Sequence, residues 1–206
     1  MPPLPYTSAR ETRRALRARR RGLAPEQRLA AERSIRRALD GLRIWRRGHR
    51  IAVFLGMPDE VDLRPCFAAA WRRGVRLYVP RILDLRRAEM TFVPLDRNAR
   101  LARNRYGIDE PVVAIARRVA ALNLDTVLVP LVGFDANGHR LGMGAGFYDR
   151  ALRRRLDRAN AFRRPLLVGV AYAAQQVDRI PRESWDVPLD LVVTERGVLD
   201  LRALST

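Results

Sequence analysis

The feature that most constrains the fold is the segment 124–150, which reads LDTVLVPLVGFDANGHRLGMGAGFYDR. It opens with a continuous apolar run at 126–132, which predicts a strand buried on both faces. The Asn137-Gly138 pair that follows favours a tight turn. A glycine-rich stretch comes next and leads into a helical pattern of apolar residues. The order of strand, glycine loop and helix predicts an α/β protein with a ligand at the loop.

The glycine loop carries Gly142, Gly144 and Gly146 at alternate positions. Glycine lets the backbone approach an anion closely because it has no Cβ. Free N–H groups of such a loop and of the helix start can bind phosphate. Asp149, about one turn into the helix, could hold Mg²⁺ beside that phosphate. The spacing G-x-G-x-G matches neither the P-loop nor the dinucleotide motif, so the glycines alone also allow a flexible surface turn.

The residues around these glycines resemble a known family. Residues 140–150, RLGMGAGFYDR, are similar to the RLGxGxGYYDR signature of the 5-formyltetrahydrofolate cyclo-ligases, also called 5,10-methenyltetrahydrofolate synthetases. Residues 129–140, VPLVGFDANGHR, resemble that family's VPGxAFDxxGxR. The sequence departs from the signature at Ala145, where glycine is common, and at Phe147, where tyrosine is common. If Ala145 required a positive φ, it would cost stability or reshape the loop.

The N-terminal arginines extend the resemblance. The pattern predicts a helix at 8–21, a break at 22–25 and a second helix that starts at Pro25. Residues 13–25 resemble the family's opening segment, whose helix supplies cations to the nucleotide phosphates. Arg10 and Arg13 fall nearest those positions, and Arg replaces the usual Lys. The resemblance thus implies an ATP-binding set of Arg10, Arg13, Arg140, Leu141, Gly142, Met143, Gly144, Ala145, Gly146, Phe147 and Tyr148.

A predicted strand at 50–55 ends near the acidic residues Asp59 and Glu60. From the residues alone, the segment from Asp59 to Asp62 could cap a helix that runs to Trp71, or its acids could face a polar ligand. The resemblance favours the second interpretation. It implies that Glu60 binds the pterin part of the folate, whose adjacent N–H groups suit a two-oxygen acceptor. The substrate-binding set that it implies is Leu55, Glu60, Met143, Gly144, Ala145, Gly146 and Phe147.

Further elements follow along the chain. Strands are predicted at 74–80, 90–94, 165–171 and 191–194, a loop at 104–111, and partly helical structure at 112–122. Glu110, in the loop, could face a ligand or stabilise the loop. Asp186 aligns with a family aspartate near the metal, and it could equally be a turn former. With Asp149, it forms the implied Mg²⁺ site.

Strands that alternate with helices predict a three-layer α-β-α, Rossmann-like and mostly parallel sheet. The 206 residues suit a single domain over 1–206, with 1–7 as a loose tail. No apolar run is long enough to cross a bilayer, and the single cysteine, Cys66, suits a reducing compartment. We therefore expect a cytoplasmic protein.

The formal net charge is +18, and all 40 basic residues are Arg. Their density at 10–50 allows three interpretations: a solvated helical face, an anionic small-molecule site, or a nucleic-acid surface. Aromatic residues are not interleaved with these arginines, and no nucleic-acid-binding motif is present. We therefore expect no nucleic-acid partner and no membrane partner, and a monomer.

The resemblance implies ATP- and Mg²⁺-dependent cyclisation of 5-formyltetrahydrofolate to 5,10-methenyltetrahydrofolate, with release of ADP and phosphate. In the family's mechanism the formyl oxygen takes the γ-phosphoryl group, N10 attacks the activated carbon, and phosphate leaves. We assign no general acid or base. Two rival functions remain: a sugar-phosphate isomerase or acyl-transfer enzyme, which would not need ATP, and a basic RNA-binding protein.

Overall fold

The computed structural model describes residues 2–104, 107, 109–157 and 165–202. Its centre is a seven-stranded sheet in the order β11-β10-β9-β6-β1-β2-β3. The five strands from β10 to β2 are parallel, and the edge strands β11 and β3 pair antiparallel to them. The strands are β1 Arg50–Ala52, β2 Arg76–Asp84, β3 Glu89–Pro94, β6 Thr126–Pro130, β9 Leu166–Val170, β10 Leu191–Thr194 and β11 Gly197–Asp200.

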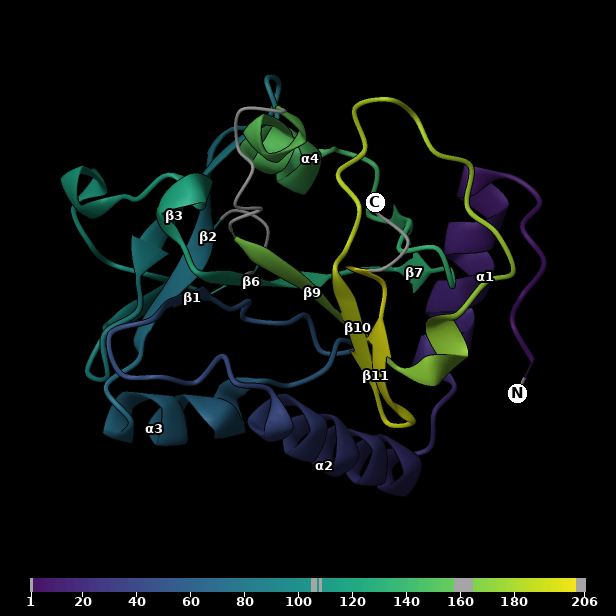
Figure 1. Cartoon of the computed structure of the whole chain (residues 1–206), viewed down its shortest axis with the longest axis horizontal. Coiled ribbons are helices and arrows are strands. Elements are labelled where there is room, and N and C mark those ends of the chain that lie inside the picture. The colour runs from purple at the N-terminus through teal and green to yellow at the C-terminus, as the bar shows by residue number, and fades with distance from the viewer. Residues whose placement is uncertain (1, 105–106, 108, 158–164, 203–206) are drawn as a thin grey trace.

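Helices cover both faces of this sheet (Figure 1). The α2 helix, Pro25–Gly41, and α3, Arg64–Arg72, lie against one face. The short α4, Phe147–Leu152, lies against the other. The α1 helix, Ala9–Arg21, stands at the side of the sheet. This arrangement confirms the predicted three-layer, mostly parallel α/β fold.

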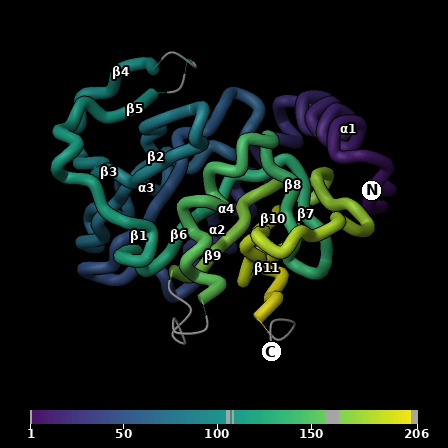
Figure 2. Tube along the Cα trace, turned by 90° about the horizontal axis from the view of Figure 1, so that it is seen from above, coloured from purple at the N-terminus to yellow at the C-terminus, as the bar shows by residue number. Residues whose placement is uncertain are grey.

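Smaller elements complete the described chain. Two short antiparallel ribbons pair β4, Leu101–Arg103, with β5, Asp109–Pro111, and β7, Gly133–Phe134, with β8, Arg140–Leu141. The β4–β5 ribbon and α1 lie at opposite ends of the molecule in the view from above (Figure 2). Four 3₁₀ turns lie at Ile115–Arg117, Ala121–Asn123, Arg153–Leu156 and Ala173–Gln175.

The apolar run at 126–132 forms the central strand β6, as predicted. Leu128 belongs to the core cluster under α2 and α3, whereas Val127 and Val129 belong to the cluster under α4. Successive side chains of a strand point to opposite faces, so a strand between two helical layers must be apolar at every position. All three side chains are fully buried.

Several predicted boundaries were wrong. The strand after Arg50 ends at Ala52, although the N–H of Val53 still donates to the carbonyl of Tyr78 at 2.8 Å. The strand predicted at 74–80 instead runs from Arg76 to Asp84. The helix that Asp59 to Asp62 could have capped starts at Arg64, whose N–H donates to Asp62 Oδ1 at 3.0 Å, whereas Asp59 pairs with a side chain of α1.

The segments predicted as loop or partly helical have different outcomes. Part of the predicted 104–111 loop, residues 109–111, forms strand β5, and residues 105, 106 and 108 lie outside the described chain. The segment predicted as partly helical at 112–122 contains one 3₁₀ turn and the start of a second, which ends at Asn123. The edge strand β11 was not predicted.

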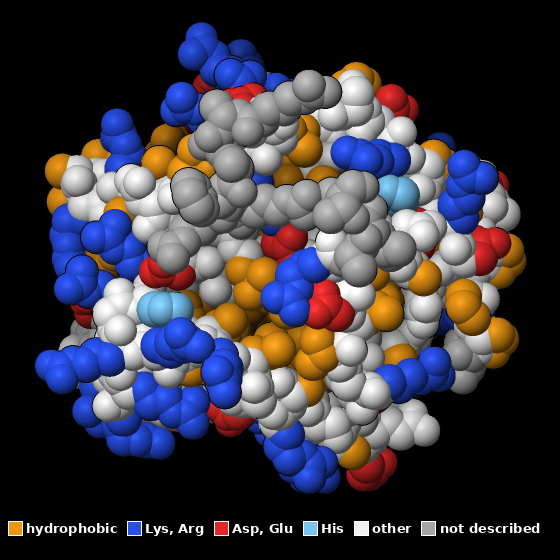
Figure 3. Space-filling view, viewed as in Figure 1, with side chains coloured by type: hydrophobic (Ala, Val, Ile, Leu, Met, Phe, Trp, Pro, Cys, Tyr) orange, Lys and Arg blue, Asp and Glu red, His pale blue; other side chains and the backbone are white. Residues whose placement is uncertain are grey.

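Arginine side chains are spread around the face seen in Figure 3, with acidic and apolar side chains between them. Three arginines, Arg33, Arg36 and Arg37, line a hollow of about 380 Å³ between α2 and α3. Cys66 lies in the same hollow, and burial raises the pKa of its thiol to about 11, so it stays protonated at neutral pH. None of the helices in the described ranges has both the length and the apolar character of a membrane span.

A substitution of Leu128 tests this description of the core. We expect Leu128→Ala to lower the free energy of unfolding by about 2–5 kcal/mol, since it leaves a cavity between two helical layers. The control is Leu29→Ala on α2, where the side chain is half exposed and the expected loss is within about 0.5 kcal/mol. Urea denaturation of both variants measures the difference, and equal losses would contradict the assigned core.

Candidate active site

A cavity of about 390 Å³ opens at the carboxyl ends of β1, β2 and β6. The chain leaves β1 towards β2 on one side, whereas β6 continues to β9 and β10 on the other. Ligands of open α/β sheets bind at such a reversal of strand order. The cavity wall is mostly apolar and includes Phe54, Leu55, Val79, Pro80, Met90 and Leu131. The remaining wall comes from the glycine loop and from the start of α4.

The glycine loop joins β8 to α4 and lies exposed at the cavity. Gly144 has φ +106° and Gly146 has φ +71°, a region that L side chains rarely adopt. Ala145, between them, has no positive φ, so alanine fits there without backbone strain. Across the described chain, no group accepts a hydrogen bond from the backbone N–H groups of 143–146. These donors can therefore bind an anion.

The α1 helix contacts this loop through Arg13, whose Nε donates to the carbonyl of Gly142 at 2.7 Å. A Cβ at Gly144 would lie in ordinary contact with the Arg13 guanidinium carbon, at 3.6 Å, so glycine is favoured here by its positive φ and not by lack of space. Arg10 is three residues earlier, on the same side of the helix, and its side chain is exposed. Both were predicted for the phosphate site. The structure brings Arg13 to the loop and leaves Arg10 in solvent.

Of the two predicted metal ligands, Asp149 bonds to the backbone of Val187, whereas Asp186 is the residue before Val187 in the chain. Arg140 donates to the carbonyl of Val187 and to Oδ1 of Asp149, which also accepts from the Val187 N–H at 3.2 Å. Asp186 directly precedes Val187, and its Oδ2 accepts from the Glu183 N–H at 2.9 Å. Asp186 therefore does form a turn, as one of its two interpretations stated.

The carboxylate oxygens around Asp149 suit Mg²⁺. Oδ2 of Asp149 has no partner elsewhere in the described ranges and lies on a residue that lines the cavity. Within those ranges, no three His, Cys, Asp or Glu side chains gather into a possible metal site. Mg²⁺ needs no such cage, because it commonly binds one or two carboxylates together with phosphate and water.

Glu60 also lines the cavity and is held by a hydrogen bond within its own loop. Its Oε2 accepts from the Met57 N–H at 3.0 Å. Burial raises the pKa of Glu60, whereas the Met57 hydrogen bond and the Arg20 charge oppose this rise. Burial also raises the pKa of Tyr148, and the Glu60 charge adds to the effect, so the phenol stays neutral.

Arg20 is the main residue that sequence analysis missed. It is 1% exposed and donates to Asp59 Oδ2 from Nε at 3.2 Å and from Nη2 at 2.8 Å. Burial would raise the pKa of Asp59, but the hydrogen bonds and charge of Arg20 hold it below its usual range. The available signal was spacing, since Arg20 follows Arg13 by seven residues and so lies on the same face of α1.

Glu110 also lines the cavity, but its partners are structural. Its Oε1 accepts from Asn104 Nδ2 at 2.9 Å, and its Oε2 lies 3.7 Å from Arg81 Nε. Arg81 also donates to the carbonyls of Pro111 and Val113 at 2.6 and 3.0 Å. These contacts attach the β4–β5 ribbon to β2, which supports the structural interpretation of Glu110.

Comparison with known proteins gives a consistent result. The model of the 5-formyltetrahydrofolate cyclo-ligase family matches residues 6–195. The chain is 35% identical over 183 residues to a 5-formyltetrahydrofolate cyclo-ligase of Escherichia coli (strain K12), with 89% of this chain and 98% of that protein covered. A protein of the same name from Haemophilus influenzae is 31% identical, with 89% and 96% covered.

Solved structures agree with these sequence relatives. The NMR structure of a 5,10-methenyltetrahydrofolate synthetase from Aquifex aeolicus has a TM-score of 0.78 and 33% identity, covering 94% of this chain and 93% of that one. A synthetase of the same name from Mycoplasma pneumoniae, 22% identical with a TM-score of 0.69, shares the fold.

The conformation of the loop predicts how its residues tolerate change. Gly146→Ala should destabilise the protein by about 1–2 kcal/mol, because a Cβ is unfavourable at its left-handed φ. The matched variant Ala145→Gly should cost less than about 1 kcal/mol, since Ala145 carries no such strain. Urea denaturation compares the two. A larger loss for Ala145→Gly would show that the loop conformation is wrong.

Proposed function

The chain belongs to the 5-formyltetrahydrofolate cyclo-ligase family, and from this premise we propose how its cavity and glycine loop carry out the reaction. The protein is an ATP-dependent ligase that cyclises 5-formyltetrahydrofolate to 5,10-methenyltetrahydrofolate, with release of ADP and phosphate. The observation that carries our assignment of the site is the junction of an apolar cavity with a loop of unpartnered N–H groups. The apolar cavity suits a flat ring, and the loop suits phosphate.

The reaction explains why both the cavity and the loop are needed. A formamide oxygen is a poor leaving group, so it must first be activated. The formyl oxygen attacks the γ-phosphorus and ADP leaves. N10 then attacks the formyl carbon, the bond from that carbon to the phosphorylated oxygen breaks, and phosphate and the N10 proton are released. Phosphoryl transfer requires mainly positioning and neutralisation of charge. The chain must therefore hold the formyl oxygen next to the phosphate-binding loop.

We assign the phosphates to the backbone N–H groups of residues 142–147 and to cations around them. Nε of Arg13 is occupied by the Gly142 carbonyl, which leaves the two Nη groups of its guanidinium for phosphate. Arg10, on the same side of α1, can reach the phosphates from solvent. Arg140 acts by fixing Asp149 and the Val187 backbone. Leu141 and Tyr148 complete the proposed nucleotide site.

We assign the folate ring to the apolar part of the cavity. Leu55 and Phe147 both line it, as does the half-exposed Met143. Among the carboxylates that line the cavity, we assign Glu60 to accept from the pterin N–H groups. Phe147, at the start of α4, would separate the ring from the phosphates.

Asp149 and Asp186 would hold Mg²⁺, the first through its free Oδ2. The ion would neutralise phosphate charge during the transfer. Arg140 keeps Asp149 oriented, so the carboxylate does not have to move into place when the ion and the nucleotide bind.

We further propose that the protein works in the cytoplasm as a monomer, without nucleic acid. Its arginines are spread over the surface instead of forming one patch on the face in Figure 3, and its single cysteine, Cys66, suits a reducing compartment. We expect that immobilised RNA does not retain the protein at low or at high salt. Retention at low salt that falls steeply as the salt concentration rises would contradict this proposal.

The folate assignment is tested by Glu60→Gln. We expect the KM for 5-formyltetrahydrofolate to rise by about 10- to 100-fold, because a charged acceptor of buried N–H groups is lost, while the KM for ATP stays unchanged. Steady-state kinetics measure both constants. The control is Glu26→Gln, an exposed glutamate of α2. An unchanged folate KM in Glu60→Gln would remove Glu60 from the site.

The metal assignment is tested by Asp149→Asn. Turnover should fall by about 100-fold or more and need a higher Mg²⁺ concentration, since a metal ion contributes several kcal/mol to a phosphoryl transfer. The matched control is Asp96→Asn, an exposed aspartate that pairs with Arg117. Wild-type turnover with the same Mg²⁺ dependence, in a folded Asp149→Asn protein, would show that this carboxylate does not hold the ion.

A further inference from the structure

We propose that Arg20 is a positioning residue that orients Glu60 and favours its carboxylate form, and that Asp59 holds Arg20 in place. Neither residue belongs to the folate or nucleotide site assigned above. The inference rests on the proposed role of Glu60 in folate binding, and it assigns a function to the most deeply buried arginine of α1.

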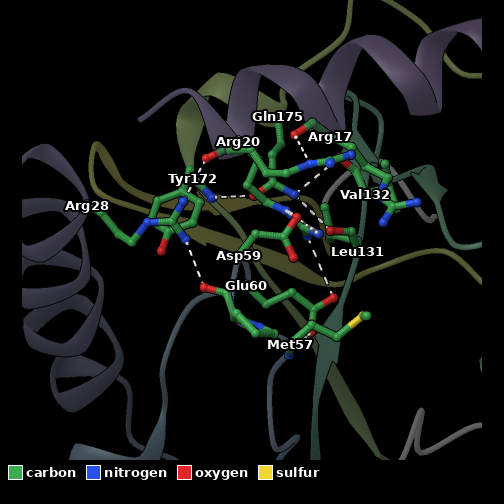
Figure 4. A network of polar contacts seen from close by, with 12 residues as sticks. Arg17, Arg20, Arg28, Met57, Asp59, Glu60, Leu131, Val132, Tyr172 and Gln175 are labelled. Carbon is green, nitrogen blue, oxygen red and sulfur yellow. Dashed lines mark hydrogen bonds and ion pairs between the residues drawn. The ribbon is translucent and has the colours of Figure 1, made fainter. Parts of the chain in front are cut away.

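The geometry places Arg20 between two carboxylates (Figure 4). Nε and Nη2 both donate to Oδ2 of Asp59, and Nη1 lies 3.6 Å from Oε1 of Glu60. The side chain of Arg20 is 2% exposed, and those of Asp59 and Glu60 are 16% and 13% exposed. A buried cation is costly unless acids surround it. Arg20 is therefore tied to this position by both acids.

The loop that carries Glu60 is held from a second side by Arg28 of α2. Arg28 donates to the carbonyl of Arg20 at 2.9 Å and to that of Pro58 at 3.4 Å, and it lies over the ring of Tyr172. The Tyr172 hydroxyl donates to Glu32 at 2.8 Å. The 57–60 loop is thus held by contacts from α1 and α2, and Tyr172, which follows β9, supports Arg28 (Figure 4). Contacts of this kind hold a binding group in one geometry.

The charges that face Glu60 have opposite effects on it. Arg20 of α1 favours the carboxylate form, whereas the neighbouring Asp59 disfavours it. Tyr148 of α4 faces it as a neutral phenol, with Arg140 nearby. Burial raises the pKa of Glu60, and the Met57 N–H and Arg20 offset part of this rise. The two members of the pair should therefore shift the ionisation of Glu60 in opposite directions when they are neutralised.

The ionisation of Glu60 determines how folate binding should depend on pH. Folate binding that needs ionised Glu60 is strong above the pKa of Glu60 and is lost as the pH falls through it. Loss of Arg20 raises that pKa, so the acid limb of the binding profile moves to higher pH. Loss of the Asp59 charge lowers that pKa, so the limb moves to lower pH.

The test compares Arg20→Met with Asp59→Asn, each close in size to the original side chain. The dissociation constant of 5-formyltetrahydrofolate is measured by calorimetry without ATP across a pH series. Arg20→Met should move the acid limb upwards by about one pH unit, with about tenfold weaker binding on the limb. Asp59→Asn should move it downwards by a smaller amount. Weaker binding at every pH in both variants, with neither limb displaced, would overturn the proposal and leave a purely structural pair.

Two further variants keep the result interpretable. The double variant Arg20→Met/Asp59→Asn removes both buried charges together, and its limb should lie between those of the single variants even if Arg20→Met alone folds poorly. Glu60→Gln should bind weakly with no acid limb of its own. If Glu60→Gln binds like the wild type, the proposed role of Glu60 fails. If Glu60→Gln binds weakly but the two limbs do not move apart, only the positioning role fails.

Discussion

The packing of α1 against the β7–β8 ribbon determines where the polar groups of the site lie. Leu16 of α1 is fully buried against Val132 and Leu141, and a Cβ on Gly133 would overlap it. Any larger residue at position 133 would therefore have to displace the Leu16 side chain. The same helix carries Arg13 to the glycine loop and Arg20 to the Glu60 loop. These arginines are two helical turns apart, about 10 Å along the axis. One helix therefore contacts both the glycine loop and the loop that carries Glu60.

Few of the chain's 40 arginines lie at the proposed site. The net charge of +18 comes from arginines, many of which lie at the surface, whereas three arginines at or beside the site are bound to defined partners. Arg13 is bound to a backbone carbonyl, Arg20 to two acids, and Arg140 to Asp149. Arginine suits these roles because its planar guanidinium can bind one partner and still offer donors to another. The function of an arginine here follows from its partners, which net charge does not reveal.

The sequence predicted the parts of the fold that local pattern determines. The apolar run of β6, the glycine loop and the helix that begins at Pro25 were all found, because burial on both faces, positive φ and proline geometry each constrain a short segment. The loop pattern itself indicated Asp149, and the family resemblance added Arg13 and favoured a ligand role for Glu60; the structure places all three around or beside one cavity. Ala145 departs from the signature without strain, a result that only the backbone angles could give.

The features that the sequence did not predict depend on contacts between segments that are distant in the chain. The chain around Asp59 could have capped a helix, but its acid pairs with Arg20, 39 residues earlier. Residues 109–111 are polar and contain proline, yet they form β5 because Arg81 and Glu110 attach that ribbon to β2. Asp186 was predicted as either a turn former or a metal ligand. Its bond to Glu183 shows the turn, and its place beside Val187 still allows the ion. No local pattern encodes such partners.

The most direct measurement of the central claim is the near-ultraviolet absorbance of the purified protein mixed with 5-formyltetrahydrofolate, Mg²⁺ and ATP, beside a mixture without ATP. The account predicts growth of the methenyl absorbance only when ATP is present. It also predicts that ADP and phosphate appear in equal amounts with the product. Growth without ATP, or none with ATP in protein shown to be folded, would contradict it.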